Sequence, residues 1–492
     1  SSLVTAEEIE KLQILAPKKV LSVKTVDSVN SHVNEGYNFT LDRSIADQLQ
    51  TIPGVDLSGQ GGQFQSYAIR GFSRARIRTE VDGIPIITDR RAGNSISFLS
   101  PNLFSTASVI KGPSSTIYGS QAMGGVVSLT TDMLEETRLE LVKGITSNSS
   151  RVTFKHRNKD LATALAYQHE NNTDGVNNIE LNNQFERVSG VVRYQHIFDN
   201  ITTTISWLPS YGRDIGKSNN KYPLLEVSEY PQEIHSLAQV QFSSNDQWLL
   251  KLFHHYQNWD SKTIRLGQYT SLTEYQSHTT GSQWLYKFNN KANSHIGIDW
   301  LARKGVSINS DYTPLVNKID ALDNELEGNE DNLAVFNQNH WQLAKAALNF
   351  SWRYDWIKQR GKQQTVTDNN LNAALSLNYA ITNHSSISFE VANGFRYPTL
   401  SERFFSGRTP RGFVAGNEHL ESESSIGSQL IIDWGNEANI RLKSSFYHYD
   451  LDNYIERYRV NEELLSYRNL ASADIKGFEL EADWYVSEQV EH

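Results

Sequence analysis

From about residue 138 to about residue 485, apolar and polar side chains alternate with a period of two. In the segment 346–356 one parity is apolar: Ala346, Leu348, Phe350, Trp352, Tyr354 and Trp356. The other parity holds Asn349, Ser351, Arg353 and Asp355. This pattern predicts a β-strand with one apolar and one polar face. Charges on the inner face of strand after strand would be costly in a soluble sandwich, whereas a wet barrel lumen accommodates them.

The composition agrees with a membrane barrel and argues against other classes. The chain has 492 residues, 38% of them hydrophobic and 11% aromatic, and no cysteine. Mean hydropathy is −0.50, and no run of about 18 apolar residues occurs, so a helical membrane span is not expected. The lack of cysteine excludes disulfide frameworks and thiolate metal sites. The net charge of −10 argues against a nucleic-acid partner.

A change in composition and in the pattern of apolar residues near Asp132 predicts two domains, 1–132 and 133–492. Glycine, proline and short apolar runs dominate before it, and alternating segments separated by polar loops follow it. About sixteen of these segments are predicted strands. They are 139–145, 151–157, 162–169, 187–198, 201–208, 236–242, 247–256, 283–288, 294–302, 333–341, 345–356, 372–380, 386–395, 427–434, 439–449 and 477–485.

Three motifs characterise the first domain. They are Ile-Arg-Gly-Phe at 69–72, Val-Asp-Gly-Ile-Pro-Ile at 81–86, and the glycine-rich stretch 107–129. The last predicts two short strands joined by a turn-rich segment. Together the motifs resemble the plug domain of TonB-dependent outer-membrane receptors. The resemblance implies an α+β plug inside a transmembrane β-barrel of about 22 strands. Because only about sixteen are found, we expect a C-terminally truncated chain.

The second domain continues the resemblance. Segments 394–404 and 416–425 resemble the family's barrel motif, and 469–471 with 475–481 resemble a later one. Glu418 and Ser422 stand where the family has prolines, and Lys111 stands where it usually has an arginine.

The function implied by the resemblance is energised import across the bacterial outer membrane. A ligand binds outside, and the inner-membrane TonB complex pulls on the plug from the periplasm. Haem, cobalamin and oligosaccharides are alternative cargoes of the same architecture. A passive porin or a barrel hydrolase is the alternative from another class. The sequence has no Gly-x-Ser-x-Gly, phosphate-loop or His-Glu-x-x-His motif, so no catalytic residue, and thus no enzyme, is expected. No cofactor is expected either.

The cargo prediction depends on residues that the resemblance assigns to the outward-facing plug apices and loops. The candidate ligand-binding residues are Gln63, Phe64, Asp89, Arg90, Arg91, Arg408 and Arg411. Four of them are arginines, which at the mouth of the barrel would attract a polyanionic ferric chelate. We therefore expect a ferric siderophore. Solvated loop arginines are the alternative interpretation.

The same resemblance predicts a plug–barrel lock. Arg70 and Lys111 correspond to plug positions that pair with two barrel glutamates, for which Glu423 and Glu479 are the candidates. Ordinary lumen-facing charges are the alternative. A lysine cannot form the two-pronged contact that an arginine makes with a carboxylate.

Other charged groups are given structural roles. Arg74, Arg76 and Arg78 are expected on one face of a strand, and Arg78 is expected to pair with Glu80 or with the barrel wall. Segment 3–6 resembles the TonB-binding motif, but it is also compatible with the start of the plug. The fourteen histidines show no compact ligand spacing, so no metal site is expected. The acidic segment 320–331 is expected to be an external loop.

Overall fold

The computed structural model describes residues 31–35, 44–59, 62–89, 96–131, 137–144, 148–175, 178–219, 225–244, 247–288, 292–314, 323–409, 412–435, 440–487 and 490–491. Among these residues, no helix is both long and apolar enough to cross a membrane. The candidate TonB-binding segment 3–6 lies outside the described residues.

The first part of the chain forms a compact plug. Its elements are β1 (Ser31–Glu35), α1 (Ile45–Leu49), β2 (Val55–Gly59), η1 (Gly62–Phe64), β3 (Gln65–Ile69), β4 (Phe72–Ser73), η2 (Arg74–Arg76), β5 (Ile77–Val81), β6 (Ile84–Pro85), η3 (Pro101–Leu103), β7 (Phe104–Lys111), α2 (Ser115–Tyr118) and β8 (Gly125–Thr131). A five-stranded sheet has the order β1-β7-β8-β5-β6, and a second sheet has the order β2-β3-β4.

The plug core follows from this topology. Strands β5 and β8 are parallel, and β7 pairs antiparallel with β8. Their alternate apolar side chains are buried together with those of α1: Ile45, Leu49, Ile77, Val81, Val109 and Val127. Ser44 caps α1 by accepting a hydrogen bond from the Asp47 amide.

The rest of the described chain forms a closed barrel. Its strands are β9 (Arg138–Lys143), β10 (Ser150–Arg157), β11 (Leu161–Glu170), β14 (Phe185–Phe198), β15 (Ile201–Lys217), β16 (Glu226–Ser244), β17 (Trp248–Arg265), β18 (Tyr269–Lys287), β19 (His295–Pro314), β20 (Asp323–Leu343), β21 (Ala346–Arg360), β22 (Thr365–Thr382), β23 (Ser385–Arg396), β26 (Glu423–Gly435), β27 (Ile440–Arg459), β28 (Leu464–Ser487) and β29 (Val490–Glu491). Small hairpins, β12 (Thr173–Asp174) with β13 (Glu180–Leu181) and β24 (Ser406–Thr409) with β25 (Gly412–Ala415), and the helix α3 (Leu400–Phe404) lie in its connections.

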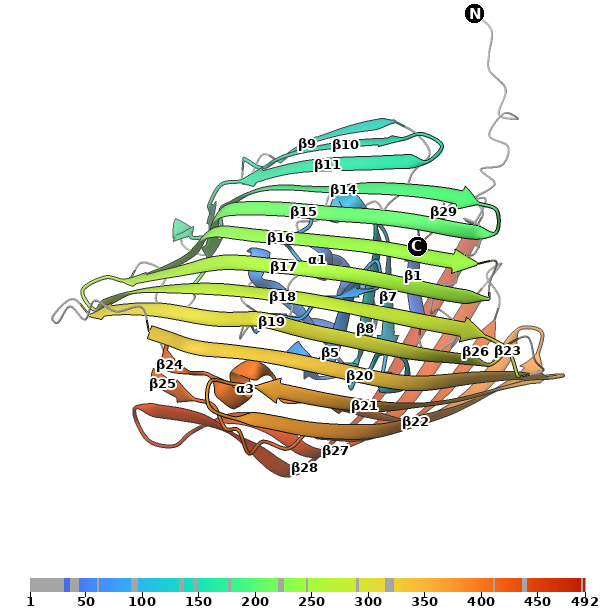
Figure 1. Ribbon diagram of the computed structural model, residues 1–492. Helices are drawn as coiled ribbons and strands as arrows, with labels where there is room; N and C mark the ends of the chain where they lie inside the picture. Colours follow the sequence, from blue (N-terminus) through green and yellow to red (C-terminus); the bar gives the residue numbers. More distant parts are fainter. Residues whose placement is uncertain are drawn as a thin grey trace, which may run out of the picture.

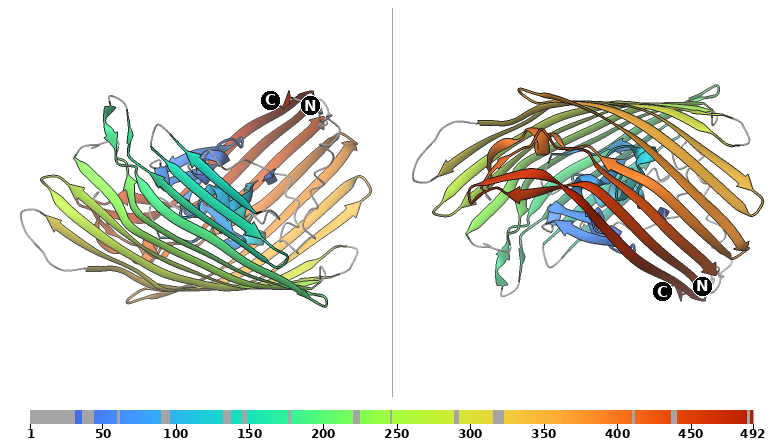
Figure 2. Two further views of the ribbon diagram at one scale, coloured as in Figure 1. Left: turned by 90° about the horizontal axis from the view of Figure 1, so that it is seen from above. Right: turned by 90° about the horizontal axis from the view of Figure 1, so that it is seen from below.

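The plug lies inside the barrel. In Figure 1 its blue strands are seen behind the green and yellow wall strands. Figure 2 shows the same strands between the green and the red sides of the wall. The predicted fold class, a transmembrane β-barrel type with an α+β plug in its lumen, is confirmed. Each predicted barrel segment overlaps a strand.

The two ends of the barrel differ in their connections. At one end, two-residue turns at 199–200, 344–345 and 383–384 join long strands. We call this the short-turn end. The opposite, long-loop end carries the connections 171–184 and 397–422. The second connection contains α3, β24 and β25, and it folds against the barrel interior near β20.

The two faces of the barrel strands separate by chemistry. On β28, Phe478 and Leu480 point outward and are 56% and 58% exposed, whereas Glu479 between them points inward and is 8% exposed. On β21, Trp356 is exposed, while Arg353 and Asp355 are buried. The lumen face therefore presents charges to the plug, and the outer face is apolar.

Two local expectations were wrong. Arg74 and Arg76 do not share a strand face with Arg78, because η2 forms a 3-10 turn before β5 begins at Ile77. Arg74 has a φ of +60° in this turn. The acidic segment 320–331 is not wholly a loop, because β20 begins at Asp323.

Candidate functional site: the contacts between plug and barrel

A cluster of four charged residues joins the plug to β28. This inner cluster consists of Arg70, Lys111, Glu479 and Glu481. Arg70 donates from Nε and Nη2 to the two oxygens of Glu479, both at 2.9 Å. Lys111 Nζ lies 2.7 Å from Glu479 Oε2 and 3.2 Å from Glu481 Oε1. In Figure 1, β28 is red and the plug is blue, so the inner cluster joins segments that are far apart in the sequence.

The conformation of the local backbone directs the Arg70 side chain toward this cluster. Arg70 and Gly71 have φ values of +49° and +85° in the tight turn between β3 and β4. The guanidinium also donates from Nη1 to the Tyr449 hydroxyl at 2.5 Å and to Gln429 Oε1 at 3.0 Å. Burial disfavours its charge, but hydrogen bonding and charge pairing with Glu479 outweigh burial and raise the pKa of Arg70. Arg70 is therefore a permanent cation, and the hydrogen bonds of its guanidinium to described residues go to the barrel.

A substitution at Gly54 tests the packing of the inner cluster. Gly54 has a φ of +77°, and a Cβ there would lie 2.1 Å from Glu479 Oε1. We expect Gly54→Ala to lower the free energy of unfolding by about 2–5 kcal/mol, because strain and overpacking add. Gly267→Ala is the control, since Gly267 has a φ of +73° with nothing within 4 Å of its Cβ position. Urea titration should show a decrease of about 1–2 kcal/mol in the free energy of unfolding for the control. An equal decrease in the two variants would contradict the overpacking expected at Gly54.

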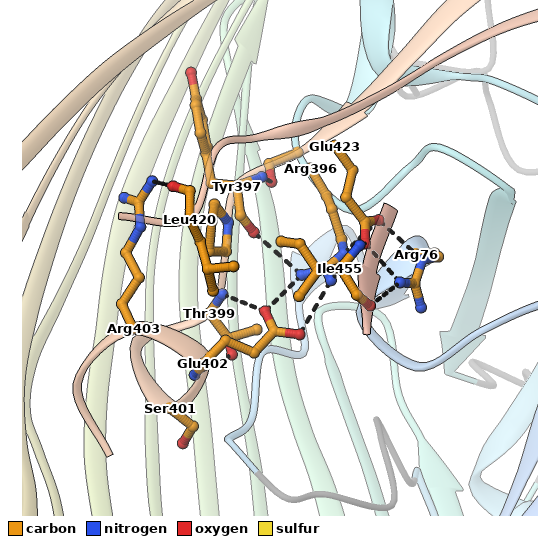
Figure 3. Close-up of polar contacts among 12 residues, drawn as sticks. Arg76, Arg396, Tyr397, Thr399, Ser401, Glu402, Arg403, Leu420, Glu423 and Ile455 are labelled. Atoms are coloured by element: carbon orange, nitrogen blue, oxygen red, sulfur yellow. Dashed lines mark hydrogen bonds and ion pairs between the residues drawn. The ribbon is translucent and has the colours of Figure 1, made fainter. Parts of the chain in front are cut away.

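A second cluster lies nearer the long-loop end (Figure 3). This outer cluster consists of Arg76, Arg396, Glu402 and Glu423. Glu423 accepts from Arg76 Nε at 2.9 Å and Nη2 at 2.5 Å, and from Arg396 Nε at 2.8 Å and Nη2 at 2.9 Å. Arg396 also bonds Glu402, at 2.7 and 3.0 Å. Glu423 is thus the shared partner of a plug arginine and a barrel arginine.

The sequence expectation for Glu423 differs from the structure. Arg70 and Lys111 both meet Glu479, whereas Glu423 meets Arg76, which sequence reasoning had left without a partner. The reason is the η2 turn, which directs Arg76 toward β26 and stacks it 3.8 Å from the Tyr454 ring centroid. Glu423 is fully buried, and the Ile455 amide donates to it at 2.5 Å.

The described apical residues of the plug are held by the wall. Gln63 and Phe64 are 5% and 3% exposed. Gln63 accepts from Arg187, and the Phe64 ring packs against Tyr230 with centroids 4.5 Å apart. The Asp89 carboxylate accepts from Arg303 Nη2 at 2.5 Å. These side chains become available to a ligand only if the plug apices leave the wall.

The expected arginines at the mouth are only partly described. Arg90, Arg91 and Arg411 lie outside the described residues. Arg408 in β24 is exposed, and its guanidinium carbon lies 5.8 Å from the centroid of the Tyr312 ring in β19. Tyr312 in turn stacks on Tyr269 at 5.1 Å. Arg408 therefore presents a positive charge beside two aromatic rings at the long-loop end.

A cavity large enough for several water molecules lies between the plug and the wall formed by β17 to β21. Arg78 and Glu80 of β5 line it and pair with each other at 3.1 Å, as the sequence predicted. The wall contributes further charges: Lys251, Asp299, Arg353 and Asp355. Water molecules can occupy about 90 Å³ of this space, enough for about six of them. The buried Oδ1 of Asp355 has no protein partner among the described residues, which agrees with hydration.

Sequence reasoning missed several of these residues. Arg396 lies in the recognised motif 394–404 but was given no role. Glu481 shares the lumen parity of Glu479, and this parity is the signal that could have identified it. Arg187 and Arg303, which hold the plug apices, also lie at lumen-facing positions of long strands, but nothing local indicates their plug partners.

Two family descriptions match this chain. Residues 144–490 match "TonB dependent receptor-like, beta-barrel", and residues 24–126 match "TonB-dependent Receptor Plug Domain". Among solved structures, the fold is similar to "Copper transporter OprC", with a TM-score of 0.77 and 14% identity over 93% of this chain and 77% of that one. It is also similar to the ferric yersiniabactin uptake receptor FyuA of Yersinia pestis, with a TM-score of 0.70 and 16% identity over 93% and 76% of the two chains.

Curated relatives agree on the family but not on the cargo. "Heme/hemopexin utilization protein C" of Haemophilus influenzae is 22% identical over 90% of this chain and 74% of its own length. "Vitamin B12 transporter BtuB" of Vibrio cholerae is 20% identical over 90% and 70%. "Hemin receptor" of Yersinia enterocolitica is 40% identical over 18% of this chain and 13% of its own length. With its plug, its barrel and both family matches, the chain belongs to the TonB-dependent receptors of the outer membrane.

Proposed function

We propose that this receptor imports a ferric siderophore by TonB-driven movement of its plug. TonB-dependent receptors are outer-membrane transporters and not enzymes. The observation that carries the gating part of the proposal is the pair of clusters around Glu479 and Glu423. In each cluster a buried plug cation pairs with a buried glutamate of the wall. Such pairs hold the plug in place, and water can replace each partner when the plug moves.

The anionic cargo is supported by positive charge at the mouth. Arg408 is exposed at the long-loop end, which faces outward because outer-membrane barrels have short periplasmic turns. Opposite charge in a confined mouth raises both encounter rate and affinity. Arg90, Arg91 and Arg411 remain candidate contacts on the basis of the sequence. Gln63, Phe64 and Asp89 are proposed to meet the ligand once their wall contacts open.

Haem is the second candidate cargo. The names of two relatives, a heme/hemopexin utilization protein and a hemin receptor, favour it. Against it, the loop between Pro398 and Asn417 contains no histidine that could ligate iron.

A growth test separates the two cargoes. An iron-uptake-deficient bacterial host expressing the chain is given one iron source at a time: a ferric catecholate, a ferric hydroxamate, ferric citrate or haemin. We expect growth when the iron source is a ferric siderophore. Growth on haemin alone would establish the second candidate instead. Growth on none of them, with the protein at the cell surface, would overturn iron import.

We further propose that the path opens on the cavity side of the plug. The buried pairs with Glu479 and Glu423 are on the β26 to β28 side. The opposite side, between β5 and the wall of β17 to β21, has a cavity beside Arg78 and Glu80 that can hold water. Moving the plug away from this wall would separate the buried pair of Asp89 with Arg303 and would leave both clusters in place.

Arg408 gives the cargo proposal a direct binding test. Arg408→Ala is expected to raise the dissociation constant for the growth-supporting ferric siderophore by about two- to ten-fold. The effect should shrink at high salt, where the field is screened. Arg459→Ala is the matched control, because Arg459 is exposed at the same end and contacts Glu462 of its own hairpin. Unchanged affinity in Arg408→Ala, or an equal loss in the control, would count against the proposal.

A further inference from the structure

Helix α3 in the long-loop connection carries a carboxylate that the helix shares with the outer cluster. Glu402 Oε2 accepts from the Thr399 amide at 2.8 Å, and the Thr399 hydroxyl accepts from the Glu402 amide at 3.1 Å. These two bonds form a capping box, which fixes the start of α3. The same carboxylate accepts two bonds from Arg396, at 2.7 and 3.0 Å. The helix therefore sets the position of Glu402 beside Arg396 (Figure 3).

Arg396 connects Glu402 to the plug. Its Nε and Nη2 donate to the two oxygens of Glu423, which also accepts two bonds from Arg76. Negative and positive groups thus alternate from α3 to the plug, in the order Glu402, Arg396, Glu423 and Arg76. Glu402 is the most exposed of these side chains, at 17%. Water therefore screens the interactions along this row only weakly.

The charges of the row are balanced only while Glu402 is ionised and in place. Burial opposes its charge, but charge pairing and hydrogen bonding with Arg396 outweigh burial and lower the pKa of Glu402. The positive charge of Arg76 acts on Glu402 in the same direction. Without Glu402, two guanidinium groups share the single carboxylate of Glu423. Arg396 then competes with Arg76 for that carboxylate, and the plug is held less firmly.

The connection that contains α3 also contains the proposed ligand contact. Phe405 alone separates α3 from β24, and Arg408 lies in β24. A ligand that moves Arg408 therefore acts on the backbone close to the end of α3. This places Glu402 between the mouth of the barrel and the outer cluster.

Two other contacts join this connection to the plug. The Tyr397 amide donates to the Ser120 hydroxyl at 3.1 Å, and the Ser401 amide donates to Asp89 Oδ1 at 3.4 Å. Both use backbone amides, and neither involves the side chain of Glu402. A substitution that changes only the charge of Glu402 therefore tests the charged route separately from these contacts.

We propose that Glu402 is a positioning residue that couples α3 to the plug. While α3 is in place, Glu402 keeps Arg396 and Glu423 arranged to hold Arg76, and displacement of α3 by a ligand gives the plug more freedom to move. The proposal deepens the proposed function and rests on its ligand contact at the mouth. Because such a coupling is reciprocal, a plug that lacks Arg76 should also loosen α3. The coupling requires no particular cargo.

Hydrogen exchange tests the coupling in the protein in detergent, without a ligand. Glu402→Gln removes the charge, but glutamine also completes a capping box, so the start of α3 is kept. Amide exchange in β5 should accelerate by about five- to fifty-fold, within the usual range for coupled sites. Glu418→Gln is the matched control, because Glu418 lies in the same connection but contacts Gln364, outside the cluster. Unchanged exchange in Glu402→Gln, or equal acceleration in the control, would overturn the proposal.

A second substitution shows whether Glu402 acts through the outer cluster. In Arg76→Gln the plug has no arginine at Glu423, so adding Glu402→Gln should accelerate exchange in β5 by no more than about two-fold, the usual error of such comparisons. A purely structural role of Glu402 in α3 would accelerate exchange equally in both backgrounds. That result would refute the assignment of Glu402 as a positioning residue.

The reciprocal measurement decides the matter if the double variant does not fold. Arg76→Gln alone should accelerate exchange of the Glu402 and Arg403 amides, which donate to Thr399, by about the same factor. Arg70→Gln is the control, because Arg70 is also a buried plug arginine but pairs with Glu479 of the inner cluster. No acceleration in Arg76→Gln, or equal acceleration in Arg70→Gln, would contradict the coupling.

Because exchange reports on the coupling and growth reports on the cargo, the two proposals fail separately. Coupled exchange with growth on haemin alone removes only the siderophore. Uncoupled exchange with growth on a ferric siderophore removes only the role of Glu402.

Discussion

Glu423→Gln is expected to weaken the attachment of the plug to the barrel strongly. Glu423 is the shared carboxylate of Arg76 and Arg396, and all three side chains are nearly fully buried. Glutamine keeps the size but leaves two buried guanidinium groups with one negative partner fewer. Removing one partner of a buried pair typically costs about 3–5 kcal/mol.

Hydrogen exchange measures this effect locally. Amide exchange in β5 of the plug should accelerate between about a hundred-fold and a few thousand-fold if opening of the plug limits it. Asp433→Asn is the matched control on the same strand, β26. Asp433 pairs with Arg441 at 2.7 Å, but the two side chains are 25% and 41% exposed, so the expected loss is at most about 1 kcal/mol. Equal acceleration in both variants would mean that the outer cluster does not hold the plug.

The barrel could be predicted from the sequence because its strands lie between two different environments, the lipid and the lumen. Side chains therefore alternate between apolar and polar along each strand. Where lipid faces one side and the lumen the other, as at Phe478 and Glu479, parity alone assigns the strand. Where a strand extends beyond the membrane, the predicted segment was shorter than the strand, because the alternation is lost there. β20 is an example, because it begins at Asp323 in an acidic stretch that has no apolar face.

The candidate site could be predicted only in part. Motifs identified Arg70, Lys111 and Glu479 as contact residues. They could not assign Glu423, because Arg70 and Arg76 are six residues apart and the 3-10 turn decides which one faces β26.

The second large effect is expected from a disulfide that fixes the plug to the wall. The hydroxyls of Thr116 in α2 and Ser351 in β21 are 2.9 Å apart and buried. Thr116→Cys with Ser351→Cys therefore places two thiols in a chain that otherwise has no cysteine. Tyr118 and Arg353, each two residues along the chain from this pair, line the cavity on whose side the path is proposed to open. If the plug must leave this wall, the oxidised form should bind its ligand but import almost none.

A disulfide inside the barrel wall provides the control. The hydroxyls of Ser228 in β16 and Thr263 in β17 are 3.0 Å apart, and both strands belong to the wall. Ser228→Cys with Thr263→Cys therefore stiffens the wall without joining it to the plug. Its uptake should be the same in oxidised and reduced form.

Uptake by the Thr116→Cys, Ser351→Cys protein, before and after reduction in the same cells, tests the central claim that cargo passes only when the plug leaves the β17 to β21 wall. The account predicts uptake near background in the oxidised form, with ligand still bound at the surface, and recovery to the parent rate after a thiol reductant. Uptake at the parent rate with the disulfide demonstrably formed would contradict it.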